Sequence, residues 1–199
     1  MKSIVARNRW VTWLIGLVIG VFVVAPSLAV AQERIGVMAA ALEPTRDAGE
    51  ALLLNATFEF ELPQALEDAV QKGIALYFNI EFELLRKRWY WFDRKVASST
   101  LTYRLSYSPL TRQYRLGRGG LSQSFESLEE ALSLLKSVRN WKVAEKSVLG
   151  ARDDYDAQVR MRLDVTQLPK PFQVNAITSR EWTLASDWRE VPVSAELMR

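Results

Sequence analysis

The chain contains no cysteine and no histidine among its 199 residues. Without cysteine it has no disulfide, no thiol nucleophile and no thiolate ligand for a metal. Without histidine it has no imidazole base and no imidazole ligand for zinc or haem. An enzyme built from this sequence would depend on carboxylates, lysine, tyrosine, serine or threonine, and no pair of acids stands out as a catalytic pair. We therefore expect a protein with no enzymatic activity, no cofactor and no metal.

The chain also lacks acidic residues before Glu33. Lys2, Arg7 and Arg9 account for the whole excess of 26 basic over 23 acidic side chains, so the rest of the chain is neutral. Proteins that bind nucleic acid need a basic surface, and this balance argues against a nucleic-acid partner. The apolar content of 49% and the charged content of 25% are typical of a folded globular domain.

The N-terminal residues 1–31 combine a short basic segment with the uncharged apolar run Trp10–Ala31. Ala29 and Ala31 match the small-residue pattern of a cleavage site, so we predict a secretory signal peptide that is cut after Ala31. The alternative is an uncleaved membrane anchor, because 22 uncharged residues are enough to cross a hydrocarbon core of ~30 Å. Both interpretations export the rest of the chain. We expect it in the periplasm, or on the periplasmic side of the inner membrane with residues 10–31 in membrane contact.

Apolar and polar residues alternate along three long segments, 51–62, 74–85 and 155–165. Side chains of a strand point alternately to its two faces, so each segment is predicted to be a strand with one buried face. A first strand is predicted over 34–42, with Ile35, Val37 and either Ala39 or Ala41 facing the core. The remaining predicted strands or extended segments are 95–107, 112–116, 141–143, 172–177 and 180–189.

Two helices interrupt these strands in the prediction. The segment 64–72 lies between Pro63, which suits the first turn of a helix, and Gly73, which suits its end. Residues 128–138 follow a capping box formed by Ser127 and Glu130, with Asn140 as the predicted stop.

These elements predict a mainly β fold of the α+β type. We expect an antiparallel β-sandwich, immunoglobulin-like in architecture, with one or two short helices. The N-terminal hydrophobic signal or anchor helix precedes it. The predicted division is residues 1–31 for the targeting segment, 32–189 for a single β-rich domain and 190–199 for a frayed tail.

The link between the strands at 74–85 and 95–107 carries three cations and four aromatic residues within the eight residues 86–93. One interpretation is a surface loop that contacts a partner or a membrane, because arginine, tryptophan and tyrosine dominate interface energetics. The structural alternative is a strand end whose rings cap the core, with arginine stems stacked on them. Alternation places Trp89 and Trp91 on one face and Tyr90 and Phe92 on the other. The candidate interaction patch consists of Arg86, Lys87, Arg88, Trp89 and Trp91.

Five blocks of the sequence resemble, in order, those of the proteobacterial DUF4390 family. The resemblance covers about Ile35 to Arg189 and implies an exported protein of unassigned function, associated with genes for a membrane sensor kinase. It gives no catalytic residues. The blocks are Phe60–Ala69, Arg88–Trp91, Thr102–Tyr107, Leu110–Leu116 and Leu168–Asn175.

These observations favour a non-enzymatic exported binding domain in the bacterial cell envelope, linked to membrane signalling, with an envelope or inner-membrane protein as its partner. The alternative hypothesis is a periplasmic carrier of an apolar ligand such as a lipid. It rests on the three long strands with apolar faces, which would hold the ligand between two sheets.

Overall fold

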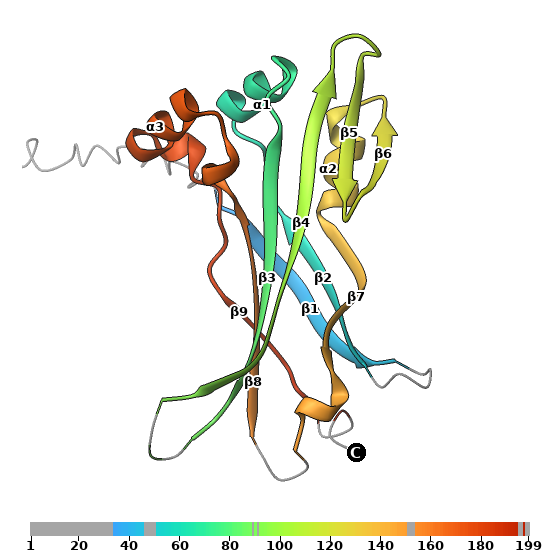
Figure 1. Ribbon diagram of the computed structural model, residues 1–199, viewed down its shortest axis with the longest axis vertical. Helices are drawn as coiled ribbons and strands as arrows, with labels where there is room; N and C mark the ends of the chain where they lie inside the picture. The colour runs from blue at the N-terminus through green and yellow to red at the C-terminus, as the bar shows by residue number, and fades with distance from the viewer. Residues whose placement is uncertain are drawn as a thin grey trace, which may run out of the picture. The chain divides into compact units, whose positions relative to one another are not determined.

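The computed structural model describes residues 34–45, 51–88, 90, 92–150, 154–194 and 197. In this part of the chain nine strands form two antiparallel sheets (Figure 1). The smaller sheet has the order β1-β2-β7 and the larger has the order β6-β5-β4-β3-β8-β9. The predicted class is thereby confirmed as a mainly β fold of two antiparallel sheets with few, short helices. The helices described here are too short or too polar to cross a membrane.

The bounds of the elements differ in detail from those predicted. The strands are β1 (Gly36–Pro44), β2 (Ala51–Glu59), β3 (Leu76–Arg86), β4 (Arg94–Ser108), β5 (Gln113–Arg118), β6 (Leu121–Phe125), β7 (Ser137–Glu145), β8 (Tyr155–Leu163) and β9 (Arg189–Val191). The helices are α1 (Gln64–Gln71), α2 (Leu128–Leu135) and α3 (Lys170–Thr178), with single 3₁₀ turns η1 (Lys146–Val148), η2 (Val165–Gln167) and η3 (Arg180–Trp182).

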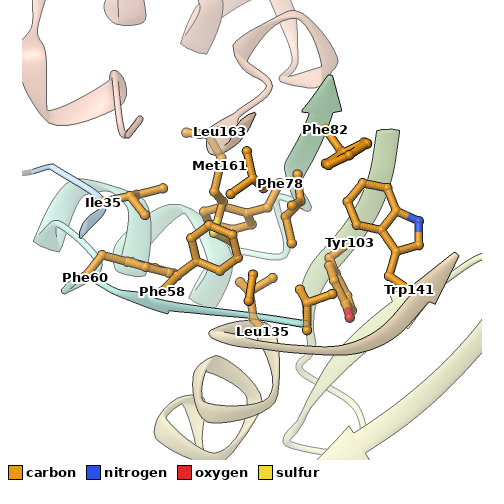
Figure 2. Close-up of a cluster of buried hydrophobic side chains, with 14 of the residues drawn as sticks. Ile35, Phe58, Phe60, Phe78, Phe82, Tyr103, Leu135, Trp141, Met161 and Leu163 are labelled. Atoms are coloured by element: carbon orange, nitrogen blue, oxygen red, sulfur yellow. The ribbon is translucent and has the colours of Figure 1, made fainter. Parts of the chain in front are cut away.

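One apolar core lies between the two sheets, and the three alternating strands line it. Figure 2 shows Phe58 and Phe60 at the end of β2 beside Phe78 of β3 and Met161 of β8. The rings of Phe60 and Phe78 stack with their centroids 5.8 Å apart. Strand β3 is central, because it pairs with β4 on one side and β8 on the other. Its inward side chains are completely buried, as predicted: Leu76, Phe78, Ile80, Phe82 and Leu84.

The predicted helix between Pro63 and Gly73 is confirmed as α1. Pro63 is the N-cap residue, and its carbonyl accepts hydrogen bonds from the amides of Leu66 and Glu67. Gly73 has a φ of +85°, a left-handed conformation that suits the residue just after a helix. The apolar face of α1 packs on the core through Leu66 and Val70, which are fully buried.

Strand β1 has a β-bulge that reverses which alanines face the core. The register with β2 shifts between Val37 and Ala39. A bulge adds one residue to one strand, so the residues after it exchange faces. The predicted inward positions of Ala39 and Ala41 are wrong, since both are exposed, whereas Ala40 is half-buried and Leu42 is buried.

The second helix is shorter than predicted. The side chain of Ser127 accepts a hydrogen bond from the amide of Glu130, as a capping residue should. Helix α2 nevertheless ends at Leu135, and β7 begins at Ser137. Asn140 has the expected positive φ of 49°, but it lies inside β7, where the register with β2 shifts. Its amide donates to the side chain of Asn55, so this residue forms a bulge in a strand and is not a helix stop.

The segment after β8 is helical where extended chain was predicted over 172–177. Helix α3 covers Lys170–Thr178, and the carbonyl of Pro169 accepts a hydrogen bond from the amide of Phe172 at 2.9 Å. Pro171 lies in the first turn of this helix, where the missing amide proton costs no hydrogen bond. The two prolines therefore begin a helix here.

The predicted strand over 180–189 is also wrong as a strand. Its residues form the 3₁₀ turn η3 and one isolated bridge between Ala185 and Arg162, followed by β9. The predicted alternation of burial is present, because Trp182 and Leu184 are buried. In the predicted tail, Val191 and Leu197 are also buried.

Strand β6, which was not predicted, forms a hairpin with β5. The turn between them consists of Gly119 and Gly120, with φ values of 53° and 87°. Two consecutive positive φ values match a two-residue hairpin turn that follows the natural twist of the strands. The sequence does not predict β6, because this strand has no alternating apolar face.

Replacing Gly120 by alanine should reduce stability by about 1–2 kcal/mol, because an L side chain is strained at its positive φ. Gly117, in the neighbouring strand β5, is the matched control, since its φ lies outside the left-handed region and an added Cβ would come no closer than 3.6 Å to any atom. Gly117→Ala should change the free energy of unfolding by less than about 0.5 kcal/mol. Urea unfolding of both variants makes the comparison, and equal losses would contradict the assignment of the turn.

Candidate interaction surface

The predicted patch lies at the end of the β3–β4 hairpin. The last cross-strand pair is Arg86 with Arg94, and residues 87–93 connect the two strands. Figure 1 shows that this end of β3 lies opposite the end next to helix α1. Trp89 and Trp91 lie outside the described residues, so the expectation for their side chains stays a prediction. The structure describes the other three members, Arg86, Lys87 and Arg88.

Lys87 fastens the hairpin end to strand β8. Its Nζ lies 2.7 Å from Oδ1 of Asp156 and 3.8 Å from Oδ2 of Asp154. The hydrogen bond with Asp156 raises the pKa of Lys87, with a smaller contribution from the negative charge of Asp154. The backbone amide of Lys87 also donates to the carbonyl of Asp154. This residue therefore positions the loop, although its side chain is exposed.

The two arginines of the patch are less exposed than Lys87. Arg86 and Arg88 are both half-buried. The backbone amide of Arg88 donates to Oδ1 of Asp93 at 3.3 Å, which joins the two sides of the loop. Lys87 through its side chain and Arg88 through its backbone thus contribute to the local structure of the hairpin end.

The most exposed large side chains of this loop are aromatic. Phe92 is 85% exposed and Tyr90 is 65% exposed. Alternation along the sequence places these two residues on one face of the segment, whereas the predicted patch contains the tryptophans and the cations. The alternation itself was the available signal, because it separates Tyr90 and Phe92 from Trp89 and Trp91.

A charged network covers the outer face of the larger sheet, next to this hairpin. Glu81 of β3 accepts hydrogen bonds at 2.7 Å from Nε of Arg160 and from Nε of Arg162, both on β8. Burial acts to raise the pKa of Glu81, but the two arginines outweigh it, and the pKa lies below its usual value. The guanidinium of Arg160 also lies over the ring of Trp188, 4.3 Å from its centre. This network joins β3, β8 and the segment that leads into β9.

Among the surface clefts formed by described residues, three have charged side chains in their lining. One of about 780 Å³ lies between α1 and α2, with Glu67, Glu129 and Lys136 among its lining residues. A second of about 720 Å³ lies along β8 and β9. A third of about 360 Å³ lies on the β4–β5–β6 part of the larger sheet, with Arg104 and Arg115 in its lining.

Comparison with known families finds a match over most of the chain. The family model described as "Domain of unknown function (DUF4390)" matches residues 35–192. This range includes all nine strands of the described fold, from β1 to β9. No curated protein and no solved structure matches the chain.

Proposed function

The chain belongs to the DUF4390 family, whose function is unknown, and we propose that it is a non-enzymatic exported binding domain of the bacterial cell envelope. In this proposal the end of the β3–β4 hairpin contacts an envelope or inner-membrane protein and contributes to signalling at the membrane. The observation that carries the proposal is the exposure of Tyr90 and Phe92 on a loop whose neighbouring cation, Lys87, is already fixed to β8. The N-terminal apolar run supports export.

Exposed aromatic rings on a fastened loop favour binding for two physical reasons. A phenylalanine that is 85% exposed gains free energy when a partner removes it from water, by roughly 1.5–3 kcal/mol for full burial. A loop already held by Lys87 and Asp156 loses less conformational entropy when it binds than a free loop does. The aromatic side chains therefore supply the contact area, and the ion pair supplies the preorganisation.

The alternative of an apolar-ligand carrier has no specific observation in its favour. It requires free space between the sheets, but the side chains there are packed and fully buried, including Phe58, Phe78 and Phe82. The three surface clefts described above contain several charged side chains each. These are poor surroundings for a lipid chain.

Photo-crosslinking in intact cells tests the proposed contact surface. A photoreactive amino acid at position 92 should form a discrete adduct with an envelope protein, and mass spectrometry of the adduct also reads the N-terminus of the mature chain. Position 110 is the matched control, because Leu110 is 95% exposed and lies on the β4–β5 turn, at the other end of the long strand β4. The proposal fails if position 92 gives no adduct or gives the same adducts as position 110.

A further inference from the structure

The part of the chain that forms β4, β5 and β6 has no negative charge. Between Asp93 and Glu126 there are six cations and no acidic residue. The chain after residue 31 is neutral overall, so the acids that balance these cations lie elsewhere. This end of the six-stranded sheet is therefore a basic surface on a neutral domain.

A cleft of about 360 Å³ lies on this basic surface. Arg104 of β4 is opposite Gly117 of β5, and Arg115 of β5 is opposite Ser106 of β4. These four residues share one face of the sheet, because they alternate with the buried Leu105 and Leu116 along the two strands. The lining also includes hydroxyl side chains and the hairpin turn: Thr102, Ser106, Ser122, Gly119 and Gly120.

Gly117 lies opposite Arg104 and two residues along β5 from Arg115, so its missing side chain leaves space beside both arginines. Its φ lies outside the left-handed region, so the backbone there does not require glycine. A Cβ at this position would meet the carbonyl of Leu121 at 3.6 Å and the Cβ of Arg104 at 3.8 Å, which are ordinary contacts. The absence of a side chain is therefore not imposed by the fold, and it keeps the centre of the cleft open.

Two polar side chains of this cleft have no side-chain partner within the described part of the chain, and a third is only partly used, although Thr102 donates to the side chain of Asn79 and Arg118 donates to the hydroxyl of Tyr103. Arg115 is exposed, and its guanidinium forms no hydrogen bond or ion pair with a described residue. Arg104 uses only its Nε, which donates to the hydroxyl of Tyr77 at 3.2 Å. Ser106 is 9% exposed, and its hydroxyl has no described hydrogen-bond partner. By contrast, Arg160 and Arg162 on the same sheet are both bound to Glu81.

We infer that this cleft binds a phosphate group, held by Arg104 and Arg115 over Gly117, with Ser106 and Ser122 as hydroxyl donors. Two guanidinium groups supply two positive charges and paired N–H donors, which match the double charge and the several oxygens of a phosphate ester better than a single carboxylate. The phosphate group belongs either to a phospholipid headgroup or to a soluble phosphate compound. This site is separate from the β3–β4 hairpin end and does not depend on the function proposed for it.

Titration of the intact ¹⁵N-labelled protein with inorganic pyrophosphate, followed by NMR at constant ionic strength, tests the site. The amide signals of Gly117, Gly119 and Gly120 should shift in a saturable way, and acetate should bind at least tenfold more weakly. Arg104→Gln and Arg115→Gln should each weaken pyrophosphate binding at least tenfold. Gly117→Val, which fills the centre of the cleft without changing the charge, should abolish it.

Arg112→Gln is the matched control, because it removes the same charge from the same hairpin at a residue that does not line the cleft. It should weaken binding less than twofold. Equal effects of Arg112→Gln and Arg115→Gln, equal binding of acetate, or no saturable shift at millimolar pyrophosphate would each overturn the inference. Thermal unfolding of every variant establishes that it is folded, and Gly117→Ala is the milder substitution if Gly117→Val does not fold.

Vesicles distinguish the two sources of the phosphate group. If vesicles of phosphatidylglycerol and phosphatidylcholine bind the protein, and both Arg115→Gln and pyrophosphate prevent this binding, the site takes a phospholipid headgroup. If pyrophosphate binds but the vesicles bind the original protein no better than they bind the Arg115→Gln variant, the site takes a soluble phosphate compound.

Discussion

Replacing Phe78 by alanine should lower the free energy of unfolding by about 3–5 kcal/mol, the usual cost of deleting a buried aromatic ring. The ring is completely buried at the centre of the core and stacks on Phe60, as Figure 2 shows. The loss has two parts. The deleted ring no longer contributes its free energy of burial, and the neighbouring side chains leave a cavity in its place. For a domain of this size it corresponds to a decrease in melting temperature of about 6–20 °C.

Phe92→Ala is the control for this prediction, because it makes the same chemical change at a residue that is 85% exposed. We expect it to cost less than about 1 kcal/mol. Urea unfolding of the two variants, monitored by tryptophan fluorescence, gives both values. If the Phe78 variant lost less than about 1.5 kcal/mol, the position of β3 between β4 and β8 would be wrong.

The strands that the sequence predicts best are those with a polar and an apolar face. In β2, β3 and β8 the alternation identifies both the element and the buried side chains, down to Phe78 and Met161. Where the alternation is interrupted by one extra residue, as near Ala39 in β1, the pattern alone assigns the wrong face. Strand β6 has almost no buried side chain, and only the double-glycine turn before it indicates a hairpin.

A residue's backbone preference is ambiguous where it fits two kinds of secondary structure. The positive φ of Asn140 suits both a helix end and a strand bulge, and the pairing of β7 with β2 decides between them. Pro169 and Pro171 suit both an extended segment and the start of a helix. Such choices depend on tertiary contacts, which a single sequence does not display.

The candidate sites likewise combine features that the sequence predicts with features that only the tertiary structure shows. The sequence identifies the aromatic and basic segment 86–93, but the ion pair of Lys87 with Asp156 joins residues far apart in the chain and cannot be seen in it. The acid-free stretch between Asp93 and Glu126 is plain in the sequence. The role of this stretch depends on strand pairing, which places Arg104 of β4 opposite Gly117 and diagonally next to Arg115 of β5.

Glu81→Gln should lower the free energy of unfolding by about 1–2 kcal/mol at neutral pH, because a largely buried carboxylate loses charged hydrogen bonds from Arg160 and Arg162. The side chain of Glu81 is 16% exposed and those of its partners are 34% and 37% exposed. Because solvent screens the partly exposed arginines, the expected loss of stability lies in the lower part of the range for charged hydrogen bonds.

The same substitution should also change how stability depends on pH. The pKa of Glu81 in the folded protein lies below its usual value, so the folded state favours the ionised form. Its contribution is complete above the unfolded pKa of about 4.3 and is lost as the pH falls through the folded pKa. The difference in stability between Glu81→Gln and the original protein should be constant from pH 7 to about pH 5.5 and should shrink below about pH 4.

Glu61→Gln is the control for both measurements, because Glu61 is exposed and makes no hydrogen bond or ion pair with a described residue. It should cost less than about 0.5 kcal/mol and leave the pH dependence unchanged. Urea unfolding at several pH values gives the comparison. A loss for Glu81→Gln that stayed the same down to about pH 3 would mean that the contribution of Glu81 comes from packing of its side chain and not from its charge.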